Sequence, residues 1–178
     1  MNAPVGISKE SPSGHTQAAS VTHTVGISDM KATDRPNDVL VTYSLGSCIG
    51  LTLFDPVAGV GGMIHCMLPL SNIDRATADR NPYMFTDTGV PALLQAIFDM
   101  GAERRRLAAK VAGAASLLDE KGMFRIGERN YTVLRKILCK NDILVAAEDV
   151  GGTVARTMYL YMQTGRTMIK SGSREMEL

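Results

Sequence analysis

The strongest constraint on the fold is a predicted β-hairpin formed by residues 49–54 and 60–68. In the first run, apolar side chains alternate and would share one face of a strand. The Asp-Pro step at 55–56 then supplies a turn, which Gly59 helps to close. Pro69 ends the second run, because proline cannot donate a hydrogen bond within a sheet. The chain therefore contains at least one antiparallel pair of strands. This pair also determines where the residues directly before and after it lie in space.

Shorter patterns around the hairpin predict a mixed domain in which strands outnumber helices. Five further runs have the length and apolar content of strands: 39–43, 107–115, 143–147, 158–162 and 167–170. Apolar residues at helical spacing predict one helix that ends at Gly101 and a second within residues 126–140. The first helix begins either at a Thr88 cap or near Tyr83 with a kink at Pro91. The expected fold class is α+β, or mixed α/β, in a single domain.

Composition divides the 178-residue chain into one domain and two ends. Residues 1–20 are rich in Ser, Pro, Gly, Thr and Ala and contain few large apolar side chains, so we expect a disordered tail. Residues 21–170 are long enough to bury one hydrophobic core. Within them, the polar residues 71–81 are expected to form a mobile loop. Residues 171–178 are expected to be a flexible C-terminus.

The composition also argues against several classes of function. A formal net charge of +1 does not suit a broad electrostatic partner such as a nucleic acid or an anionic membrane surface. The sequence contains no run of about 18 apolar residues, so we expect no insertion into a membrane. The N-terminus also lacks the apolar region of a secretory signal. Three cysteines at irregular spacing predict reduced thiols in the cytoplasm rather than a disulfide framework.

Cys48 is the candidate nucleophile. It follows Gly46 and Ser47 in a turn between two predicted strands, where glycine permits unusual backbone angles and close approach of a substrate. A turn of this kind can leave its N–H groups unpaired, and these groups could hold a developing oxyanion. A protonated thiol is a poor nucleophile, so Cys48 requires a neighbouring base.

His65 is the candidate base by elimination. Of the two other histidines, His15 lies in the predicted tail and His23 lies at its edge. His65 is on the second strand of the predicted hairpin, and Cys48 directly precedes the first strand. The imidazole can therefore serve Cys48 if these two strands are adjacent.

Two residues compete for the role of orienting the imidazole. Thr42, on the preceding strand, could accept a hydrogen bond from one ring nitrogen. Asp55 is the charged alternative, but it suits the turn before Pro56 better. Cys66 should point away from His65, because neighbouring residues on a strand face opposite sides. Cys66 is therefore expected to be a core thiol, and we expect no metal site that uses it.

Several motifs carry a family resemblance. They are T-x-x-L-G-S-C at 42–48, G-G-M-x-H-x-M-L-P at 61–69, I-G-x-R-N at 126–130, E-D-x-G-G at 148–152, Arg156, and T-G-R at 164–166. In these motifs the chain resembles CheD, the family of bacterial chemoreceptor glutamine deamidases. The resemblance covers about residues 21–170, and the first two motifs, in this order and at this separation, are quite specific.

The resemblance implies a fold, an activity and partners. The fold would be a mixed β-sandwich with helices packed outside. Cys48 would be the nucleophile, His65 the general base and Thr42 the third member of a triad. The substrates would be selected glutamines on the cytoplasmic helical bundle of chemoreceptors, and each would become a glutamate through a thioester without a metal or organic cofactor. A partner similar to the CheC phosphatase would compete with receptors for the same surface.

Three features depart from the family pattern. Ala112 and Ala114 stand where the family usually has a phenylalanine and a glycine. Cys66 stands where the family often has an aromatic residue, and the N-terminal tail is longer than usual. None of these changes falls on the presumed triad, so we expect them to affect substrate contacts and the choice of partner.

The residues leave three other interpretations open. In the first, the Gly-Ser-Cys corner is only a tight turn, and the protein is a non-catalytic adaptor that docks on receptors or on a phosphatase. In the second, the same groups serve a glutamyl methylesterase or another thiol hydrolase. In the third, Cys48 and Cys66 belong to a metal or redox protein.

Overall fold

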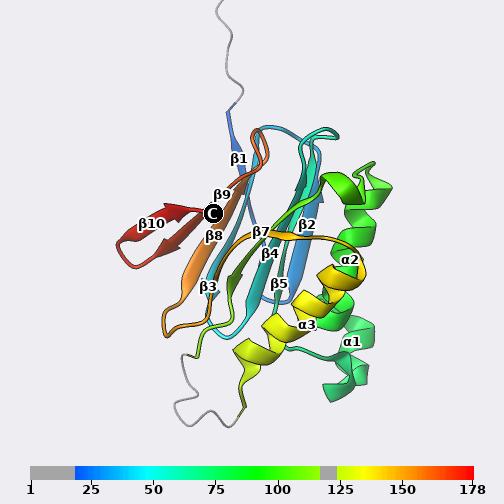
Figure 1. Cartoon of the computed structure of the whole chain (residues 1–178), viewed down its shortest axis with the longest axis vertical. Coiled ribbons are helices and arrows are strands. Elements are labelled where there is room, and N and C mark those ends of the chain that lie inside the picture. Colours follow the sequence, from blue (N-terminus) through cyan, green and yellow to red (C-terminus); the bar gives the residue numbers. More distant parts are fainter. Residues whose placement is uncertain (1–18, 117–123) are drawn as a thin grey trace, which may run out of the picture.

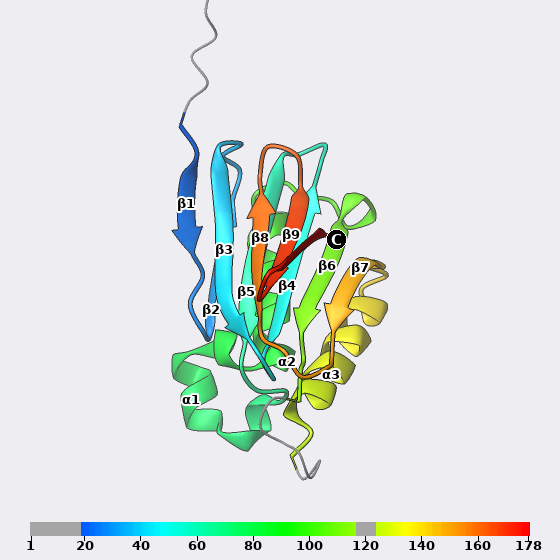
Figure 2. The same ribbon diagram turned by 90° about the vertical axis from the view of Figure 1, so that its left-hand side faces the viewer.

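Two five-stranded β-sheets pack face to face, and helices cover the outer side of one of them (Figures 1 and 2). The structure is a computed structural model that describes residues 19–116 and 124–178. The predicted tail at residues 1–20 lies almost entirely outside the described residues. The order of layers is sheet, sheet, helix. This order confirms the expected α+β class, with a mixed β-sandwich and helices packed outside.

The first sheet contributes one face to the centre of the sandwich, and no helix of the described residues covers its other face (Figure 2). Its strands in spatial order are β1 (Val21–Thr24), β3 (Asp38–Leu45), β8 (Arg156–Tyr161), β9 (Arg166–Ser171) and β10 (Arg174–Glu177). Strands β1 and β3 are parallel, and the other neighbours are antiparallel.

The second sheet lies between the first sheet and the helices. Its strands in spatial order are β2 (Asp29–Thr33), β5 (Val60–Cys66), β4 (Ile49–Asp55), β6 (Ala108–Gly113) and β7 (Val145–Val150). The antiparallel pair β4–β5 is the predicted hairpin, and it places Gly50 opposite His65 and Ile49 opposite Cys66. Strands β6 and β7 are parallel, so the sheet is mixed.

The helices pack on the outer face of the second sheet (Figure 1). They are α1 (Arg75–Arg80), α2 (Thr86–Asp99) and α3 (Ile126–Lys140), with short 3-10 turns η1 (Ser71–Ile73), η2 (Pro82–Met84) and η3 (Arg104–Arg106). Helix α3 fills the whole range within which the second helix was predicted. Helix α2 begins at Thr86, between the two predicted starts, because Phe85 is fully buried and fixes the entry of the chain. The hydroxyl of Thr88 donates instead to the Pro82 carbonyl at 2.6 Å.

Two hydrophobic clusters fill the spaces between the layers. The alternating residues Ile49, Leu51 and Leu53 of β4 point to the helices, together with Ile64 and Cys66 of β5. The space between the sheets holds a second cluster that shares buried leucine and methionine side chains: Leu40, Leu45, Met63, Met158, Leu160 and Met162. Each face of the second sheet is therefore buried, which explains why β4 and β5 are buried along their whole length.

Two predictions about irregular segments were wrong. Residues 71–81 were expected to be a loop, but they contain η1 and α1. Helix α1 has only six residues and no apolar stripe, and its start is set by the Asp74 carboxylate, which accepts from the N–H of Thr77 at 3.0 Å. Residues 171–178 were expected to be a flexible end, but β10 pairs with β9 there. Met176 and Leu178 pack on the cluster between the sheets, and this burial stabilises the end of the chain.

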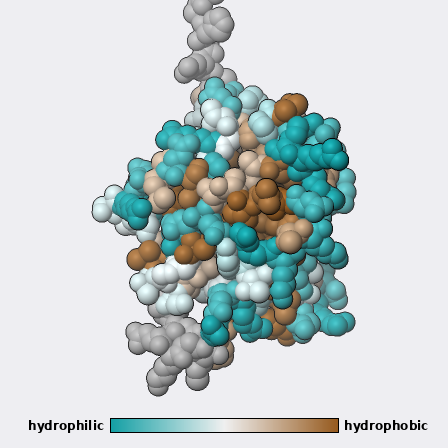
Figure 3. Space-filling view, viewed as in Figure 1, coloured by the Kyte–Doolittle hydropathy of each residue, from teal (hydrophilic) through white to brown (hydrophobic). Residues whose placement is uncertain are grey.

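In the view of Figure 3, apolar residues gather in a patch near the middle of the face and in smaller groups elsewhere, with hydrophilic residues around them. Some exposed apolar surface is usual for a folded protein. Among residues 19–116 and 124–178, no helix combines the length and the apolar character needed to cross a membrane.

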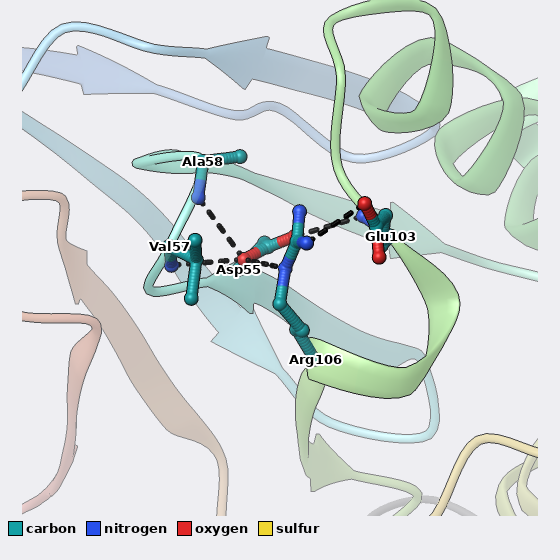
Figure 4. Close-up of polar contacts among 5 residues, drawn as sticks. All are labelled: Asp55, Val57, Ala58, Glu103 and Arg106. Carbon is teal, nitrogen blue, oxygen red and sulfur yellow. Dashed lines mark hydrogen bonds and ion pairs between the residues drawn. The ribbon is translucent and has the colours of Figure 1, made fainter.

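A buried carboxylate closes the turn of the hairpin (Figure 4). Asp55 is completely buried and accepts hydrogen bonds from the N–H groups of Val57, Ala58 and Glu103 and from the guanidinium of Arg106. These donors hold the pKa of the Asp55 carboxyl well below its usual range, although burial alone would raise it. Asp55 is therefore the turn residue. It cannot orient His65, because the hairpin register places it opposite Val60, at the far end from His65.

We expect Asp55→Asn to lower the free energy of unfolding by about 2–3 kcal/mol, because the substitution leaves Arg106 without its buried charged partner. This is less than the roughly 3–5 kcal/mol typical of a broken buried ion pair, since Arg106 itself is partly exposed. Denaturant unfolding at pH 7 measures the change. Glu103→Gln is the matched control, because that exposed carboxylate also pairs with Arg106 but should matter by less than about 0.5 kcal/mol. Equal losses for the two variants would contradict this account.

Candidate active site

A three-residue loop, Gly46–Ser47–Cys48, carries the chain from the first sheet to the second. Strand β3 ends at Leu45 and β4 begins at Ile49. Just before the loop, the register between β3 and β8 shifts, and Ser44 adopts a left-handed conformation with φ of 57°. Non-glycine residues rarely adopt this conformation, and they do so chiefly where the surrounding structure requires it. The bulge therefore turns the chain towards the second sheet and places Cys48 directly before β4.

Backbone hydrogen bonds hold this loop to the end of β6. The N–H of Ala115 donates to the Gly46 carbonyl at 2.8 Å, and the N–H of Ala114 donates to the Cys48 carbonyl at 2.7 Å. Gly113 has a φ of 104° and lies directly against the Cys48 carbonyl, where a Cβ atom would not fit. Glycine is therefore required at this position for the close approach of β6 to the loop.

The third carbonyl of the loop is held by a side chain. The Ser47 carbonyl accepts a hydrogen bond from Asn130 Nδ2 of α3 at 3.1 Å. The N–H groups of Gly46, Ser47 and Cys48, in contrast, donate to no other residue in the described part of the chain. In a planar trans peptide, the C=O and the following N–H point in opposite directions. Since the carbonyls face the scaffold, the N–H groups of Ser47 and Cys48 face away from it.

A pocket of about 290 Å³ opens beside this loop. It is lined by one residue of β3, the loop, the residues that follow β6, and the residues before and at the start of α3: Ser44, Gly46, Ser47, Cys48, Ala115, Ser116, Phe124, Arg125, Ile126 and Gly127. Cys48 is partly exposed in it. Burial raises the pKa of the Cys48 thiol above its usual value, so the resting thiol is protonated at neutral pH.

His65 and Thr42 form a hydrogen bond between the two sheets. His65 is on β5, Thr42 is on β3, and both side chains are completely buried. Thr42 Oγ1 and His65 Nδ1 are 2.7 Å apart. The imidazole therefore spans the space between the sheets, and the threonine fixes its orientation.

The other ring nitrogen of His65 has no partner among the described residues, although it is buried. We assign the ring proton to Nδ1, where it donates to Thr42, because a buried N–H without an acceptor is rare in proteins. This leaves Nε2 with a free lone pair. Burial lowers the pKa of His65 to about 4, so the ring is neutral at pH 7 and can act as a base.

The strand register places Cys48 and His65 on the same face of the second sheet. His65 lies opposite Gly50, and Cys48 directly precedes β4, two residues before Gly50. Cys48 packs on the cluster between the sheets, which is also the side of the Thr42–His65 hydrogen bond. The structure thus places the thiol, the imidazole and the threonine on the same side of the second sheet, with no hydrogen bond from another described residue to Nε2 of His65.

Cys66 lies on the other side of the sheet. It packs among the residues under α2, and burial raises the pKa of its thiol far above the usual value. Cys48 and Cys66 therefore face different layers and do not converge on one site. Cys139 is exposed near the end of α3 and does not line the pocket at Cys48.

Comparison with known proteins supplies the family. The profile of a family described as CheD chemotactic sensory transduction matches residues 67–171. A protein of Solibacter usitatus named probable chemoreceptor glutamine deamidase CheD is 51% identical over 154 residues, which is 86% of this chain and 91% of that protein. A Syntrophus aciditrophicus protein named probable chemoreceptor glutamine deamidase CheD 1 is 44% identical over 147 residues, covering 83% of this chain and 92% of that protein.

The chain belongs to the CheD family. The resemblance drawn from its motifs is therefore confirmed. Among solved structures, a Bacillus licheniformis hypothetical protein, YfiH, aligns with a TM-score of 0.44 and 16% identity over 74% of this chain and 59% of that one. A likeness this weak supports no conclusion about the chain.

The departures from the CheD pattern at β6 leave the loop contacts in place. Ala114 has a φ of 54°, a left-handed conformation that the usual CheD glycine adopts without strain. Alanine there costs about 1–2 kcal/mol, which the surrounding contacts offset. Its contact with Cys48 is made by the backbone N–H and does not depend on the side chain.

Sequence reasoning gave no role to Asn130, although the CheD motif at 126–130 contains it. Asn130 is completely buried, and its amide contacts the loop that carries Cys48. Side-chain type alone offered no signal, because buried asparagines usually serve structure. The separation of 83 residues between Asn130 and Ser47 also hid their contact.

We expect the stability of the protein to depend on His65 between pH 7 and pH 5. The folded pKa of about 4 lies below the ordinary value of 6.5, so the unfolded state binds more protons in this range, and stability falls as pH falls. For this one group the loss between pH 7 and pH 5 is about 2 kcal/mol. Denaturant unfolding of the wild type and of His65→Gln at both pH values measures it.

The wild type should lose about 2 kcal/mol more than His65→Gln over this range. Carboxylates titrate in both proteins, so their contribution to the change in stability cancels in this comparison. An equal dependence on pH in the two proteins would show that the folded imidazole is not held neutral by burial.

Proposed function

We propose that this CheD protein is a chemoreceptor glutamine deamidase that uses Cys48 as its nucleophile. The observation that carries the proposal is the shared face of Cys48 and His65, with the ring held by Thr42 and Nε2 left free. The names of the CheD relatives supply the substrate, because they describe chemoreceptor glutamine deamidases. The pocket at Cys48 is where a glutamine side chain would enter.

The first half of the reaction forms a thioester. Nε2 of His65 takes the thiol proton while the sulfur of Cys48 attacks the carbon of the substrate amide. The N–H groups of Ser47 and Cys48 donate to the oxygen of the tetrahedral intermediate, which carries a negative charge. Protonated His65 then gives its proton to the amide nitrogen. The C–N bond breaks, and ammonia leaves.

The second half regenerates the thiol. Nε2 of His65 takes a proton from water, and the resulting hydroxide attacks the thioester carbonyl. The C–S bond breaks, the sulfur recovers the proton, and a glutamate side chain is released. The net reaction consumes one water and converts an amide to a carboxylic acid and ammonia, which ionise to carboxylate and ammonium at neutral pH.

The neutral resting pair suits this sequence of steps. A thiol with a raised pKa and an imidazole with a lowered pKa do not form an ion pair before the substrate is bound. The proton moves only as the carbon–sulfur bond forms, when the developing oxyanion stabilises the imidazolium. The same property protects Cys48 from general electrophiles, because the thiol form is a poor nucleophile.

The consequence for the receptor is a change of charge on a helical surface. Each turnover replaces a neutral amide with a carboxylate, and like charges on neighbouring positions repel by a few tenths of a kcal/mol. Several such changes can shift the balance between two receptor states. The deamidation would therefore take place in the cytoplasm, where the helical bundle of the receptors lies. A partner similar to the CheC phosphatase would compete with receptors by covering the pocket at Cys48.

Incubation of the protein with a cytoplasmic receptor fragment tests the proposal. We expect peptide mass spectrometry to show selected glutamines converted to glutamates by the wild type. Cys48→Ser and His65→Gln should each lower the rate by at least about a hundredfold, because each removes one member of a unit that acts together. Addition of a CheC-like phosphatase should slow the wild-type reaction.

The chain offers a matched control for each variant. Cys139→Ser removes an exposed cysteine outside the site, and His23→Gln removes a histidine on β1, and both should keep the wild-type rate. Deamidation that survives in both Cys48→Ser and His65→Gln would contradict the assigned roles. A wild type that binds the fragment without converting any glutamine would favour the adaptor.

A further inference from the structure

Asn130 joins three segments of the site with one buried amide. Nδ2 donates to the Ser47 carbonyl at 3.1 Å and to the Met67 carbonyl at 3.1 Å. Oδ1 accepts from the hydroxyl of Thr86 at 3.0 Å. Ser47 precedes the nucleophile, Met67 follows His65 by two residues, and Thr86 begins α2. A single residue of α3 therefore links the loop that carries Cys48 to the end of the strand that carries His65.

The chemistry of these neighbours permits only one orientation of the amide. Two carbonyl oxygens can only accept, so they require the NH₂ group, and the Thr86 hydroxyl then donates to the oxygen. A flipped amide would place oxygen against two carbonyls and leave a buried polar group unpaired. Because every polar atom of the side chain is used, the position of Asn130 is strongly determined.

The contact with Ser47 controls the direction of the next N–H group. The Ser47 carbonyl and the Cys48 N–H belong to the same peptide unit, which is planar and trans. When Asn130 holds the carbonyl towards α3, the N–H of Cys48 must point the opposite way. That N–H has no acceptor on another described residue.

We propose that Asn130 is a positioning residue that orients the Ser47–Cys48 peptide, so that the Cys48 N–H is aimed at the oxyanion formed during deamidation. The inference rests on the proposed function for its chemical outcome. Asn130 does not itself contact the reacting atoms. Its second bond, to Met67, sets the distance between the loop and the end of β5, so that thiol, base and N–H keep one geometry.

The experiment compares Asn130→Asp with the wild type. Aspartate has nearly the same shape and can still accept from Thr86, but its carboxylate cannot donate to the Ser47 and Met67 carbonyls. We expect kcat for deamidation of a receptor fragment to fall by about tenfold or more, with KM changed by less than about twofold. The ¹H–¹⁵N resonance of Cys48 should shift and broaden, because its peptide is no longer held in one orientation.

Two further variants keep the test independent of folding. Thr86→Val removes the donor that fixes the amide of Asn130, and it should lower kcat by a smaller factor and move the Cys48 resonance in the same direction. Tyr131→Phe is the matched control on α3, because the tyrosine hydroxyl contacts Glu148 and no residue of the site. It should change neither kcat nor the Cys48 resonance.

The outcomes separate the two proposals. An Asn130→Asp or Thr86→Val protein with wild-type kcat and an unmoved Cys48 resonance overturns the role of Asn130, even if the wild type is an active deamidase. A loss that appears only in KM also overturns it, because an oriented oxyanion donor acts on the chemical step. A wild type without deamidase activity refutes the proposed function, and the Cys48 resonance then decides alone whether Asn130 sets the peptide.

Discussion

The hydrogen bond between Thr42 and His65 connects the two sheets at the place where the chain crosses between them. It forms only if β3 and β5 face each other with Thr42 and His65 at matching positions along the strands. That alignment requires the packed cluster of leucine and methionine side chains between the sheets. It also fixes which nitrogen of the ring is free. The geometry of the candidate active site thus depends on the packing of the two sheets. The close-packed core around His65 holds its imidazole in one position.

Burial favours the neutral form of both reacting groups. It keeps the imidazole neutral, so that Nε2 has a free lone pair, but it also keeps the thiol protonated and therefore a poor nucleophile. The loop that carries Cys48 avoids a similar conflict by separating its polar groups. Its carbonyls are satisfied by β6 and Asn130, and its N–H groups are left for a substrate. A loop whose N–H groups were all hydrogen-bonded within the protein would be more stable, but it would have no donor left for an oxyanion.

Much of this arrangement follows from the sequence, and particular residues show why the rest does not. The alternation in residues 49–54 and the Asp-Pro turn predict the hairpin. Because neighbouring residues on a strand face opposite sides, the hairpin also predicts that His65 and Cys66 point apart. Helix α1 was not predicted because it has no apolar stripe, and its start is set by a carboxylate cap. The end of the chain escaped because the partner of β10 is set by the β9 turn and by Met176 burial. Asn130 escaped because its contacts join residues far apart in the chain.

The protonation state of His65 is the property on which the whole account depends. Two-dimensional ¹H–¹⁵N NMR of the His65 ring, recorded between pH 3.5 and pH 8, measures it directly. The account predicts a proton on Nδ1 and a bare Nε2 at pH 7, with titration near pH 4. A ring that is protonated on Nε2 at pH 7, or that is already an imidazolium there, would contradict it.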